Sequence, residues 1–576
     1  MLWTVTSFLF FTGMVGFIAW IRTRRENLKT TDGYFLAGRG LTGWVIAGSM
    51  ILTNLSAEHL VGLNGQSYAI NLSGMAWECT AAFATIIMAL YFLPRYLRGA
   101  FTTLPEFFED RYDASTRRLM SLLLLAGYMA ITLPAGVLYP GAVAVNRIFN
   151  IGELFNVDYG WALWISVWFI GVVGAVYAIV GGLKAVAVSD SVNGVGLLIG
   201  GLLVPVFGLV ALGDGSLGDG LTKLVEETPL KLNAIGGPED HVPFGTIFTG
   251  MIFANLFYWG TNQAVIQRSL GAKSLKEGQK GVLLTGVFKI FVPLIMMVPG
   301  IIAFQMFPNL RDADLAYPTL IAETFPKPLL GFFIAVLLGA VLSTYNSLLN
   351  SAATVFCLDI YKPVFKPDIS EAELIQKGKF VATIVAIVTL FVAPFILFAP
   401  EGLYQFSRRS TGFYNIPMIA LVLTGFFTKR VSGIAARVAV IFYIITYILL
   451  VFVFDEPINF IHLMGILFVF MVVIMLIISR FKPRETPYFM NLHKKAVDLT
   501  PWKWGPILAL IIMGLLVFVY ILCSPIGLAS TTGLGTSFYL WTSVLITVFL
   551  FMMVALLRRQ GIINISSKPG GSDNEK

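Results

Sequence analysis

Residues 51–59 read Ile51-Leu52-Thr53-Asn54-Leu55-Ser56-Ala57-Glu58-His59, a polar cluster in the middle of an apolar segment that runs from about residue 43 to residue 70. Five apolar segments later, residues 254–263 read Ala254-Asn255-Leu256-Phe257-Tyr258-Trp259-Gly260-Thr261-Asn262-Gln263 and interrupt another apolar segment in the same way. An odd spacing of crossings reverses topology, so residues 43–213 and 245–427 are predicted to be inverted repeats. Paired interrupted helices at matching positions of two repeats indicate the binding site of a transporter. Backbone groups freed at each break need ions, solute, water or neighbouring protein as partners.

The composition around these stretches is that of a membrane protein. Of the 576 residues, 57% are hydrophobic and 12% are charged, whereas soluble chains are about 25% charged. Long apolar segments predict helices, because the strands of a membrane barrel are short and alternate in polarity. The net charge of +8 lies in loops between apolar segments, so it indicates membrane orientation rather than nucleic-acid binding. We therefore expect an all-α polytopic protein that lies in the lipid bilayer.

Fifteen apolar segments are long enough to cross a hydrocarbon core, which needs about 20 helical residues. They lie roughly at 3–21, 43–70, 74–97, 117–147, 160–181, 190–213, 245–265, 280–306, 328–357, 379–399, 403–427, 434–453, 458–479, 505–522 and 536–557. Outside the two repeats we expect an extra N-terminal helix with a basic loop, an extracellular loop, extra C-terminal helices and a polar tail. These parts are residues 1–42, 214–244, 428–557 and 558–576, respectively.

Basic residues alternate between loops along the chain. Lys and Arg cluster in every second loop, whereas residues 148–159 and 523–535 contain none. Because loops rich in Lys and Arg stay in the cytoplasm, we expect the N-terminus outside and the C-terminus inside, in the cell (inner) membrane.

Three ionisable residues at membrane depth are candidates for a solute site. Lys289 is the lone charge in residues 281–302, and a lysine at that depth costs on the order of 2.5–3.5 kcal/mol. It faces a cavity, or it forms a structural ion pair or caps carbonyl groups. Glu78 contacts solute or is solvated near the interface. His59 follows the first break and can donate and accept hydrogen bonds together, although a lone histidine is more often a satisfied core residue.

An amide and two aromatic rings share a helical face at the second break. Asn255, Tyr258 and Trp259 stand at positions i, i+3 and i+4. This set suits a sugar, because the amide can bond to hydroxyls while the rings form a flat wall for the apolar ring face. For the two aromatic residues alone, core packing is the commoner role.

Two adjacent hydroxyls mark a candidate cation site. Ser343 and Thr344 lie late in the segment 328–357, and with carbonyls from a broken helix they would form an oxygen site for a small cation. The alternative is that they contribute to helix packing. Asp190 opens the segment 190–213; it neutralises an ion or acts as a helix N-cap, and both interpretations stay open.

A set of motifs runs in order along the chain. They are Tyr34-Phe35-Leu36-Ala37-Gly38-Arg39, Asn54–His59, Leu104–Phe108 with Arg111-Tyr112, Gly181–Val186, Asn255–Gln263 with Ile266-Gln267-Arg268, Leu349–Thr354 and Asp359–Lys362. Together they resemble the sodium:solute symporter family, most closely its bacterial sodium/galactose (sodium/glucose) members. The resemblance covers roughly residues 30–430. It implies the five-plus-five inverted-repeat fold, extended by N- and C-terminal helices to about 14–15 crossings, and it implies Na+ as a transported ion rather than a bound cofactor.

The resemblance also implies residue roles. It assigns sugar contacts to His59, Glu78, Asn255 and Lys289, with Tyr258 as an inner gate against the sugar ring and Trp259 beside it. It assigns the sodium site to the carbonyls of Leu52, Leu55 and Ala340 and to the hydroxyls of Ser343 and Thr344. Asp190 matches an acidic residue near a second cation in some relatives, but Ala340 lacks the hydroxyl that two-sodium members carry there, which argues against a second sodium.

Two departures from the galactose symporters bear on the solute. Where they have a glutamine, this chain has His59, as animal glucose symporters do. Arg408 stands near another glutamine sugar contact, and an arginine there could recognise an acidic sugar or could extend to the membrane interface, which is slightly favoured.

The resulting expectation is sodium-coupled import of a sugar, a hexose such as glucose or galactose, by alternating access. The alternatives are a polyol or an acidic sugar (inositol, uronic or sialic acid), or a transport-inactive membrane sensor of the same fold. An enzyme is not expected, because the sequence offers no nucleophile–base–acid set and no His/Cys metal cluster. No obligatory protein partner is evident from the sequence.

Overall fold

The structure is a computed structural model that describes residues 2–23, 37–56, 58–311, 313–398, 403–454, 458–490 and 497–561. Most of the predicted basic loop after the first segment (residues 24–36), the start of the Tyr34–Arg39 motif and the tail beyond residue 561 lie outside the described residues. Within the described residues the secondary structure is helical, with two isolated bridges, Leu41 to Ala272 and Ser274 to Asp498.

The helices follow one another along the chain in two sets. In the first half they are α1 (Leu2–Thr23), η1 (Ala37–Arg39), α3 (Gly43–Asn54), η2 (His59–Leu63), α4 (Asn64–Ala69), η3 (Leu72–Gly74), α5 (Met75–Ile87), η4 (Met88–Phe92), α6 (Leu93–Gly99), α7 (Leu104–Arg111), α8 (Ala114–Gly127), η5 (Tyr128–Thr132), η6 (Pro134–Leu138), α9 (Tyr139–Phe149), α10 (Ile151–Phe155), α11 (Tyr159–Leu212) and α12 (Leu217–Glu227). In the second half they are η7 (Pro229–Leu232), η8 (Phe244–Phe248), α13 (Gly250–Gly260), α14 (Gln263–Leu270), α15 (Leu275–Met296), α16 (Val298–Met306), η9 (Ala313–Leu315), α17 (Ala316–Thr324), α18 (Lys327–Val355), η10 (Phe356–Phe365), α19 (Glu371–Val392), η11 (Ala393–Phe398), α20 (Leu403–Phe427), α21 (Gly433–Ile448), η12 (Leu449–Val453), α22 (Phe460–Phe481), α23 (Gly505–Leu522) and α24 (Thr536–Arg559).

The predicted crossings are matched by helices. Among the described residues, eleven helical segments are long and apolar enough to cross a membrane, and they coincide with eleven of the predicted segments. The other four predicted segments correspond to α1, to the interrupted pairs α3–α4 and α13–α14, and to the first arm of α11.

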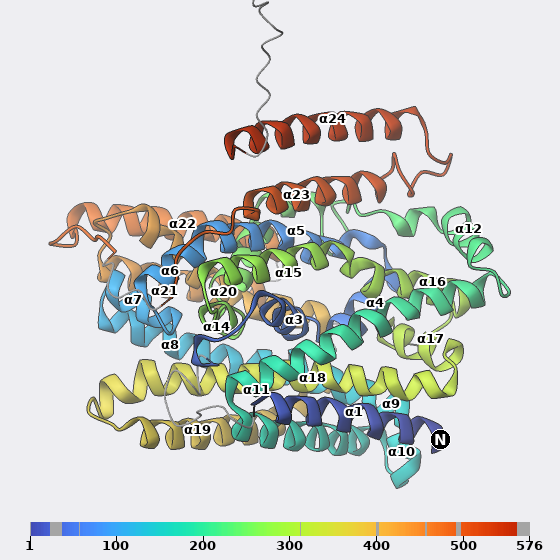
Figure 1. Cartoon of the computed structure of the whole chain (residues 1–576), viewed down its shortest axis with the longest axis horizontal. Helices are drawn as coiled ribbons and strands as arrows, with labels where there is room; N and C mark the ends of the chain where they lie inside the picture. Colours follow the sequence, from blue (N-terminus) through green and yellow to red (C-terminus); the bar gives the residue numbers. More distant parts are fainter. Residues whose placement is uncertain are drawn as a thin grey trace, which may run out of the picture.

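Helix α11 contains two predicted crossings. Its 54 residues would extend about 80 Å at 1.5 Å per residue, far more than a hydrocarbon core of about 30 Å. Figure 1 shows it as two arms that meet near its middle. The separate segments 160–181 and 190–213 are therefore one bent helix rather than two helices joined by a loop.

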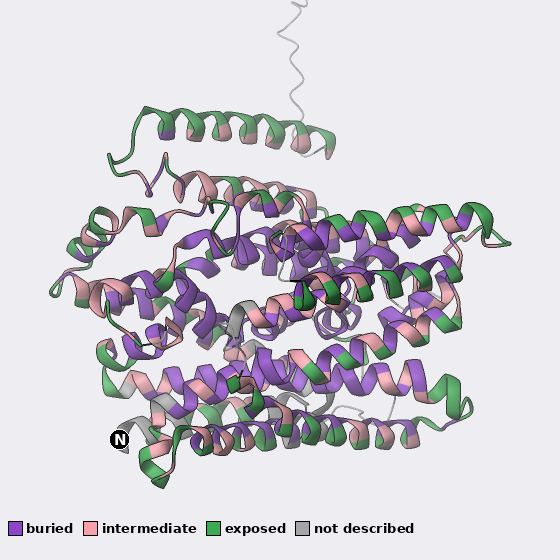
Figure 2. Cartoon of the chain, turned by 180° about the vertical axis from the view of Figure 1, so that it is seen from behind, coloured by how far each residue is buried: buried purple, intermediate pink, exposed green. Residues whose placement is uncertain are grey.

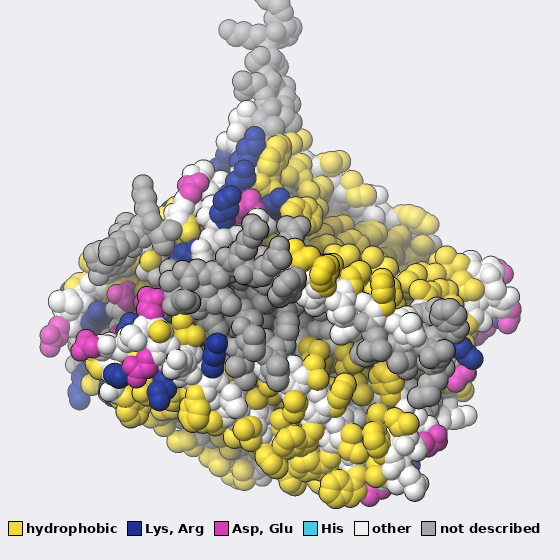
Figure 3. All heavy atoms as spheres, turned by 60° about the horizontal axis from the view of Figure 1, so that its bottom comes forward, with side chains coloured by type: hydrophobic (Ala, Val, Ile, Leu, Met, Phe, Trp, Pro, Cys, Tyr) yellow, Lys and Arg dark blue, Asp and Glu magenta, His cyan; other side chains and the backbone are white. Residues whose placement is uncertain are grey.

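The helices form a slab with two polar ends. In Figure 1 the start of α1, α10 and α12 lie at one end, and α7 and the end of α24 lie at the other. Figure 3 shows hydrophobic side chains over the middle of one face, with charged side chains gathered mainly toward the ends. This arrangement agrees with the predicted alternation of loops. The absolute orientation and the division into repeats 43–213 and 245–427 stay predictions.

Burial separates central helices from peripheral ones. Figure 2 shows buried residues concentrated in the interior, whereas α24 is exposed along its length, and Phe538 is its one buried residue. Helix α15 packs against both α3 and α5 at the centre, and α18 packs against α3 and α11.

Both predicted interruptions are confirmed. Helix α3 ends at Asn54, and helical structure resumes near His59; α13 ends at Gly260, and α14 begins at Gln263. At the second break the protein itself supplies partners, because Asn262 Oδ1 accepts hydrogen bonds from the Ala264 amide (3.0 Å) and from the Tyr128 hydroxyl (2.6 Å). The first break instead faces α18, where the Thr344 hydroxyl lies within 3.3 Å of the Leu52 carbonyl.

Candidate functional site

The seven predicted solute contacts meet at one cavity. Its lining residues are Asn54, His59, Trp77, Glu78, Ala254, Asn255, Tyr258, Trp259, Lys289, Arg408, Thr411, Asn415 and Met464. They come from α3, η2, α5, α13, α15, α20 and α22. The cavity has a volume of about 30 Å³, and a single water needs about 10–15 Å³ by this measure. The walls therefore lie close together, and a hexose would require them to move apart.

Lys289 is buried against a carboxylate. Its ammonium donates hydrogen bonds to Glu78 Oε2 and to Asn54 Oδ1, and it lies 5.5 Å from the centre of the Trp259 ring. The side chains of Lys289 and Glu78 are 1% and 3% exposed, so solvation of Glu78 at the interface is excluded in this structure. Lys289 therefore forms a buried ion pair and also faces a cavity. The sequence analysis had treated these two roles as alternatives.

Arg408 also lies in the cavity wall. Its Nη2 is 3.2 Å from Glu58 Oε1 and 3.2 Å from His59 Nε2, and its guanidinium lies 5.7 Å from the centre of the Trp77 ring. The slightly favoured interpretation, in which this arginine extends to the membrane interface, is wrong for this structure. Glu58, its buried partner, was missed as a site residue, although it stands inside the polar cluster at residues 51–59.

His59 joins the two ion pairs. Its Nε2 is 3.5 Å from Glu78 Oε1 and near Arg408, while its Nδ1 is 3.1 Å from Ser56 Oγ. The result is one chain, Glu58–Arg408–His59–Glu78–Lys289, which we call the charge chain. With a neutral histidine its two carboxylates and two cations cancel, as buried charges require.

The amide and aromatic residues complete the walls. Asn255 Nδ2 donates to Thr80 Oγ1 at 2.8 Å, and the Tyr258 and Trp259 rings meet edge to face at 5.3 Å. Tyr258 also lines a second cavity of about 50 Å³, which reaches Thr53, Thr344 and Tyr414. Asn54, His59, Tyr258, Arg408, Thr411 and Asn415 line both cavities and so form the partition between them. Tyr258 lies in this partition and is therefore placed to act as a gate between the two cavities.

Oxygen atoms gather where α18 meets the first break. The Thr344 hydroxyl lies 3.1 Å from the carbonyl of Ala340, 3.3 Å from that of Leu52 and 3.1 Å from that of Thr53. The structure thus brings together Leu52, Ala340 and Thr344 as predicted, and it adds the Thr53 carbonyl, which the sequence analysis omitted. Leu55 follows directly at the break.

Ser343 supplies the other predicted hydroxyl. Its Oγ is buried; it forms no hydrogen bond of ordinary geometry, but it interacts with the Asp190 carboxylate. A hydroxyl oxygen beside a carboxylate is of the ligand type that a hard cation prefers.

Asp190 is paired with an arginine. It lies inside α11, whose N-cap is Asp158, so the N-cap interpretation is wrong. Asp190 Oδ2 accepts a hydrogen bond from Ser49 Oγ at 2.9 Å and lies 3.5 Å from Arg268 Nη2. Arg268 is fully buried in α14 and donates hydrogen bonds to Ser49, Ser347 and the Ala264 carbonyl.

Within the part of the chain that the structure describes, no group of three or more His, Cys, Asp or Glu side chains is placed to hold a metal ion. The candidate cation site consists of carbonyl and hydroxyl oxygens, the ligand type that hard cations prefer.

Comparison with known proteins gives consistent results. The profile of the sodium:solute symporter family matches residues 34–443. The chain is 43% identical to the uncharacterized symporter YidK of Escherichia coli (strain K12), over 99% of each chain. It is 31% identical to the sodium/glucose cotransporter of Vibrio parahaemolyticus, over 74% of this chain and 81% of that protein. A solved structure of a Na+-coupled sialic acid symporter, in a substrate-bound outward-open state, superposes with a TM-score of 0.72 and 20% identity, over 84% of this chain and 99% of the other.

Proposed function

The chain belongs to the sodium:solute symporter family, and on this premise we propose that it imports a neutral, polyhydroxylated solute, a hexose such as glucose or galactose, together with Na+. Transport runs by alternating access across the inner membrane, with the N-terminus outside and the C-terminus in the cytoplasm. Sodium is the driving ion and is released with the solute.

The observation that carries the choice of solute is the charge chain. Both cations that line the first cavity have a carboxylate partner: Lys289 has Glu78, and Arg408 has Glu58. An acidic sugar would have to compete with these buried carboxylates for the cations, whereas a neutral sugar can bond to both signs of charge through its hydroxyls. The charge chain therefore favours neutral sugars over acidic ones. A neutral polyol such as inositol satisfies the same argument.

The remaining walls support a ring-shaped solute. The Asn255 amide offers a donor and an acceptor, while Tyr258 and Trp259 offer aromatic surface. We propose that His59, Glu78, Asn255, Lys289 and Arg408 bond to sugar hydroxyls, and that Tyr258 closes the site toward the second cavity.

Sodium binds where α3 ends against α18. We propose that its ligands are the carbonyls of Leu52, Leu55 and Ala340 and the hydroxyls of Ser343 and Thr344. The convergence of three carbonyls on Thr344 and the buried Ser343 hydroxyl support this position. Asp190 stands close by as a counter-charge to Arg268 and keeps that buried arginine from repelling the ion.

One sodium ion supplies enough free energy for accumulation. A charge that moves through 100 mV gains about 2.3 kcal/mol, and a tenfold concentration gradient adds about 1.4 kcal/mol. Together they support a sugar gradient on the order of several hundredfold.

Uptake into proteoliposomes tests the proposal. Radiolabelled glucose, galactose, inositol and glucuronate are supplied with and without an inward sodium gradient. We expect uptake of a neutral hexose that requires sodium. Sodium-driven uptake of glucuronate in preference to all neutral solutes would contradict the charge argument, and absence of any uptake from a wider panel would favour a sensor.

A further inference from the structure

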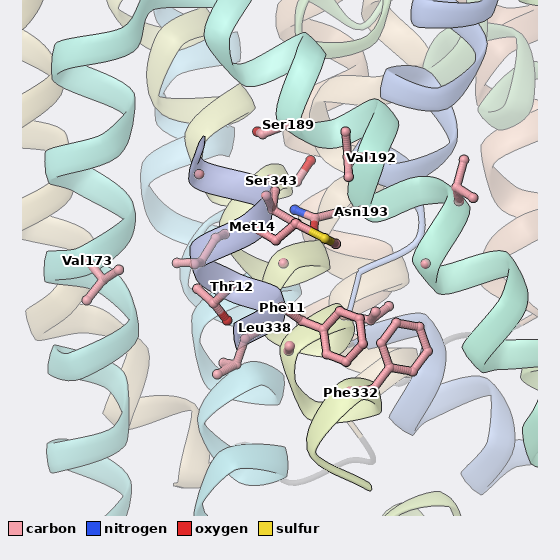
Figure 4. Close-up of a pocket in the computed structure, with 18 of the residues that line it drawn as sticks. Phe11, Thr12, Met14, Val173, Ser189, Val192, Asn193, Phe332, Leu338 and Ser343 are labelled. Carbon is pink, nitrogen blue, oxygen red and sulfur yellow. The ribbon is translucent and has the colours of Figure 1, made fainter. Parts of the chain in front are cut away.

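A large apolar cavity lies outside the solute site, between α1, α11 and α18 (Figure 4). Its volume is about 740 Å³, which is within the range of about 300–1,000 Å³ that small-molecule sites occupy. Phe11 and Val15 line it from α1, Phe169 and Val195 from α11, and Phe332 and Leu338 from α18. We call this space the α1 groove.

The α1 groove opens toward the lipid. Its rim includes Phe169 and Val195, which are 55% and 58% exposed. All three helices correspond to predicted membrane crossings, and the exposed apolar residues Val173 and Ile199 continue the rim. The mouth of the groove is thus part of the lipid-facing surface, where acyl chains rather than water fill the available space.

The inner wall of the groove reaches the proposed sodium site. Figure 4 shows Ser189, Asn193 and Ser343 together on one side of the cavity, with the rings of Phe11 and Phe332 on another. Ser343 is the residue whose buried hydroxyl we propose as a sodium ligand. Consequently, the material in the groove borders the residue proposed to bind sodium.

The lining chemistry selects among amphiphiles. None of the described residues that line the groove is charged, so a carboxylate or phosphate inside it would lack a counter-charge and pay the desolvation cost. A hydrocarbon chain has no such cost and buries apolar surface against all three helices.

We propose that one acyl chain of a membrane phospholipid occupies the α1 groove, with its headgroup outside, and closes the lipid side of the sodium site. The closure of the sodium site rests on the proposed function, whereas the binding of the acyl chain does not. A free fatty acid is the competing source, and its carboxylate makes it the poorer fit.

Two glycines of α1 allow a matched test. Gly16 lines the groove and Gly13 does not, and a Cβ atom added at either position meets nothing within 4 Å. Gly16→Leu therefore fills the groove, and Gly13→Leu adds the same side chain to the same helix elsewhere.

Photo-crosslinking reads out occupancy without transport. The protein is reconstituted in vesicles of phosphatidylethanolamine and phosphatidylglycerol that contain a trace of phosphatidylcholine with a diazirine on one acyl chain. We expect labelling of the α18 peptide in the wild type and in Gly13→Leu, and its loss in Gly16→Leu. Equal labelling of α18 in all three proteins would overturn the proposal.

Three further arms complete the test. If Gly16→Leu fails to insert, Val15→Phe, also in the lining, replaces it with the same expectation. A diazirine on a free fatty acid that labels α18 more strongly than the phospholipid would overturn the assigned source. If the acyl chain closes the lipid side of the sodium site, Gly16→Leu should shift the sodium activation of uptake relative to Gly13→Leu. Loss of labelling with unchanged sodium activation would refute this closure, but not the binding of the acyl chain.

Discussion

The guanidinium of Arg408 and the carboxylate of Glu58 lie 3.2 Å apart, and their side chains are 17% and 7% exposed. One residue belongs to α20 and the other to the break that follows α3. Because the pair is buried, removal of either partner leaves an uncompensated charge, which costs on the order of 3–5 kcal/mol. The contact therefore ties the cavity wall to the break after α3, and its loss should lower the stability of the protein.

Neutralisation of Glu58 should change the preferred charge of the solute. In Glu58→Gln, Arg408 loses its carboxylate, so we expect affinity to shift from neutral hexoses toward uronic acids. Competition by glucose and by glucuronate against labelled substrate measures the ratio.

The double variant is the control for that shift. Glu58→Gln with Arg408→Gln removes both charges, and it should restore the preference for neutral hexoses. An unchanged ranking in the single and double variants would show that Arg408 does not contact the solute.

Lys289→Ala should weaken solute binding strongly. A hydrogen bond to a charged group is worth about 1.5–3 kcal/mol, which corresponds to a roughly ten- to hundredfold loss of affinity. Equilibrium binding of the labelled sugar measures it. Because Ala leaves Glu78 unpaired, Lys289→Gln with Glu78→Gln serves as the control for charge. Wild-type affinity in both variants would assign Lys289 a structural role only.

Ser343→Ala should weaken sodium activation of uptake while high sodium largely rescues sugar affinity. The change removes one proposed ion ligand, and Ser343 lines neither of the two cavities at the charge chain. Thr383→Ala removes a hydroxyl from the exposed face of α19 and should behave as wild type. If sodium dependence is unchanged in Ser343→Ala, the sodium site does not lie at the proposed position.

Asp190→Asn tests the pair with Arg268. Both side chains are essentially unexposed, so a lone arginine charge should destabilise the protein by about 3–5 kcal/mol. Thermal unfolding in detergent measures the change. Asp190→Asn with Arg268→Gln should recover part of the loss, because no charge is then left alone; a single variant as stable as wild type would make the pair energetically irrelevant.

Local sequence pattern was enough to predict the helices and their breaks. A polar run inside an apolar segment predicts a break in the helix. The interruptions after Asn54 and Gly260 could therefore be predicted from the sequence without knowledge of tertiary contacts. The set of solute residues came from the family resemblance, which assigns His59, Lys289 and their neighbours to one site.

Pairing between distant segments could not be predicted in the same way. Glu58 meets Arg408 only because α20 packs beside the first break, and nothing in either local pattern indicates that contact. Arg268 follows the second break in a short polar helix, which resembles a loop in sequence, although packing against α3 and α18 buries it. The bend in α11 was likewise hidden, because its middle is polar enough to look like a connection between two helices.

The central claim is that sodium at the first break and sugar at the charge chain stabilise each other. Equilibrium binding to the purified protein tests it most directly: hexose affinity is measured in Na+ and in K+, and Na+ affinity is measured with and without hexose. Linkage requires the two factors to be equal, and we expect a value of about 5–150-fold. Hexose affinity that is identical in Na+ and in K+ would contradict the account.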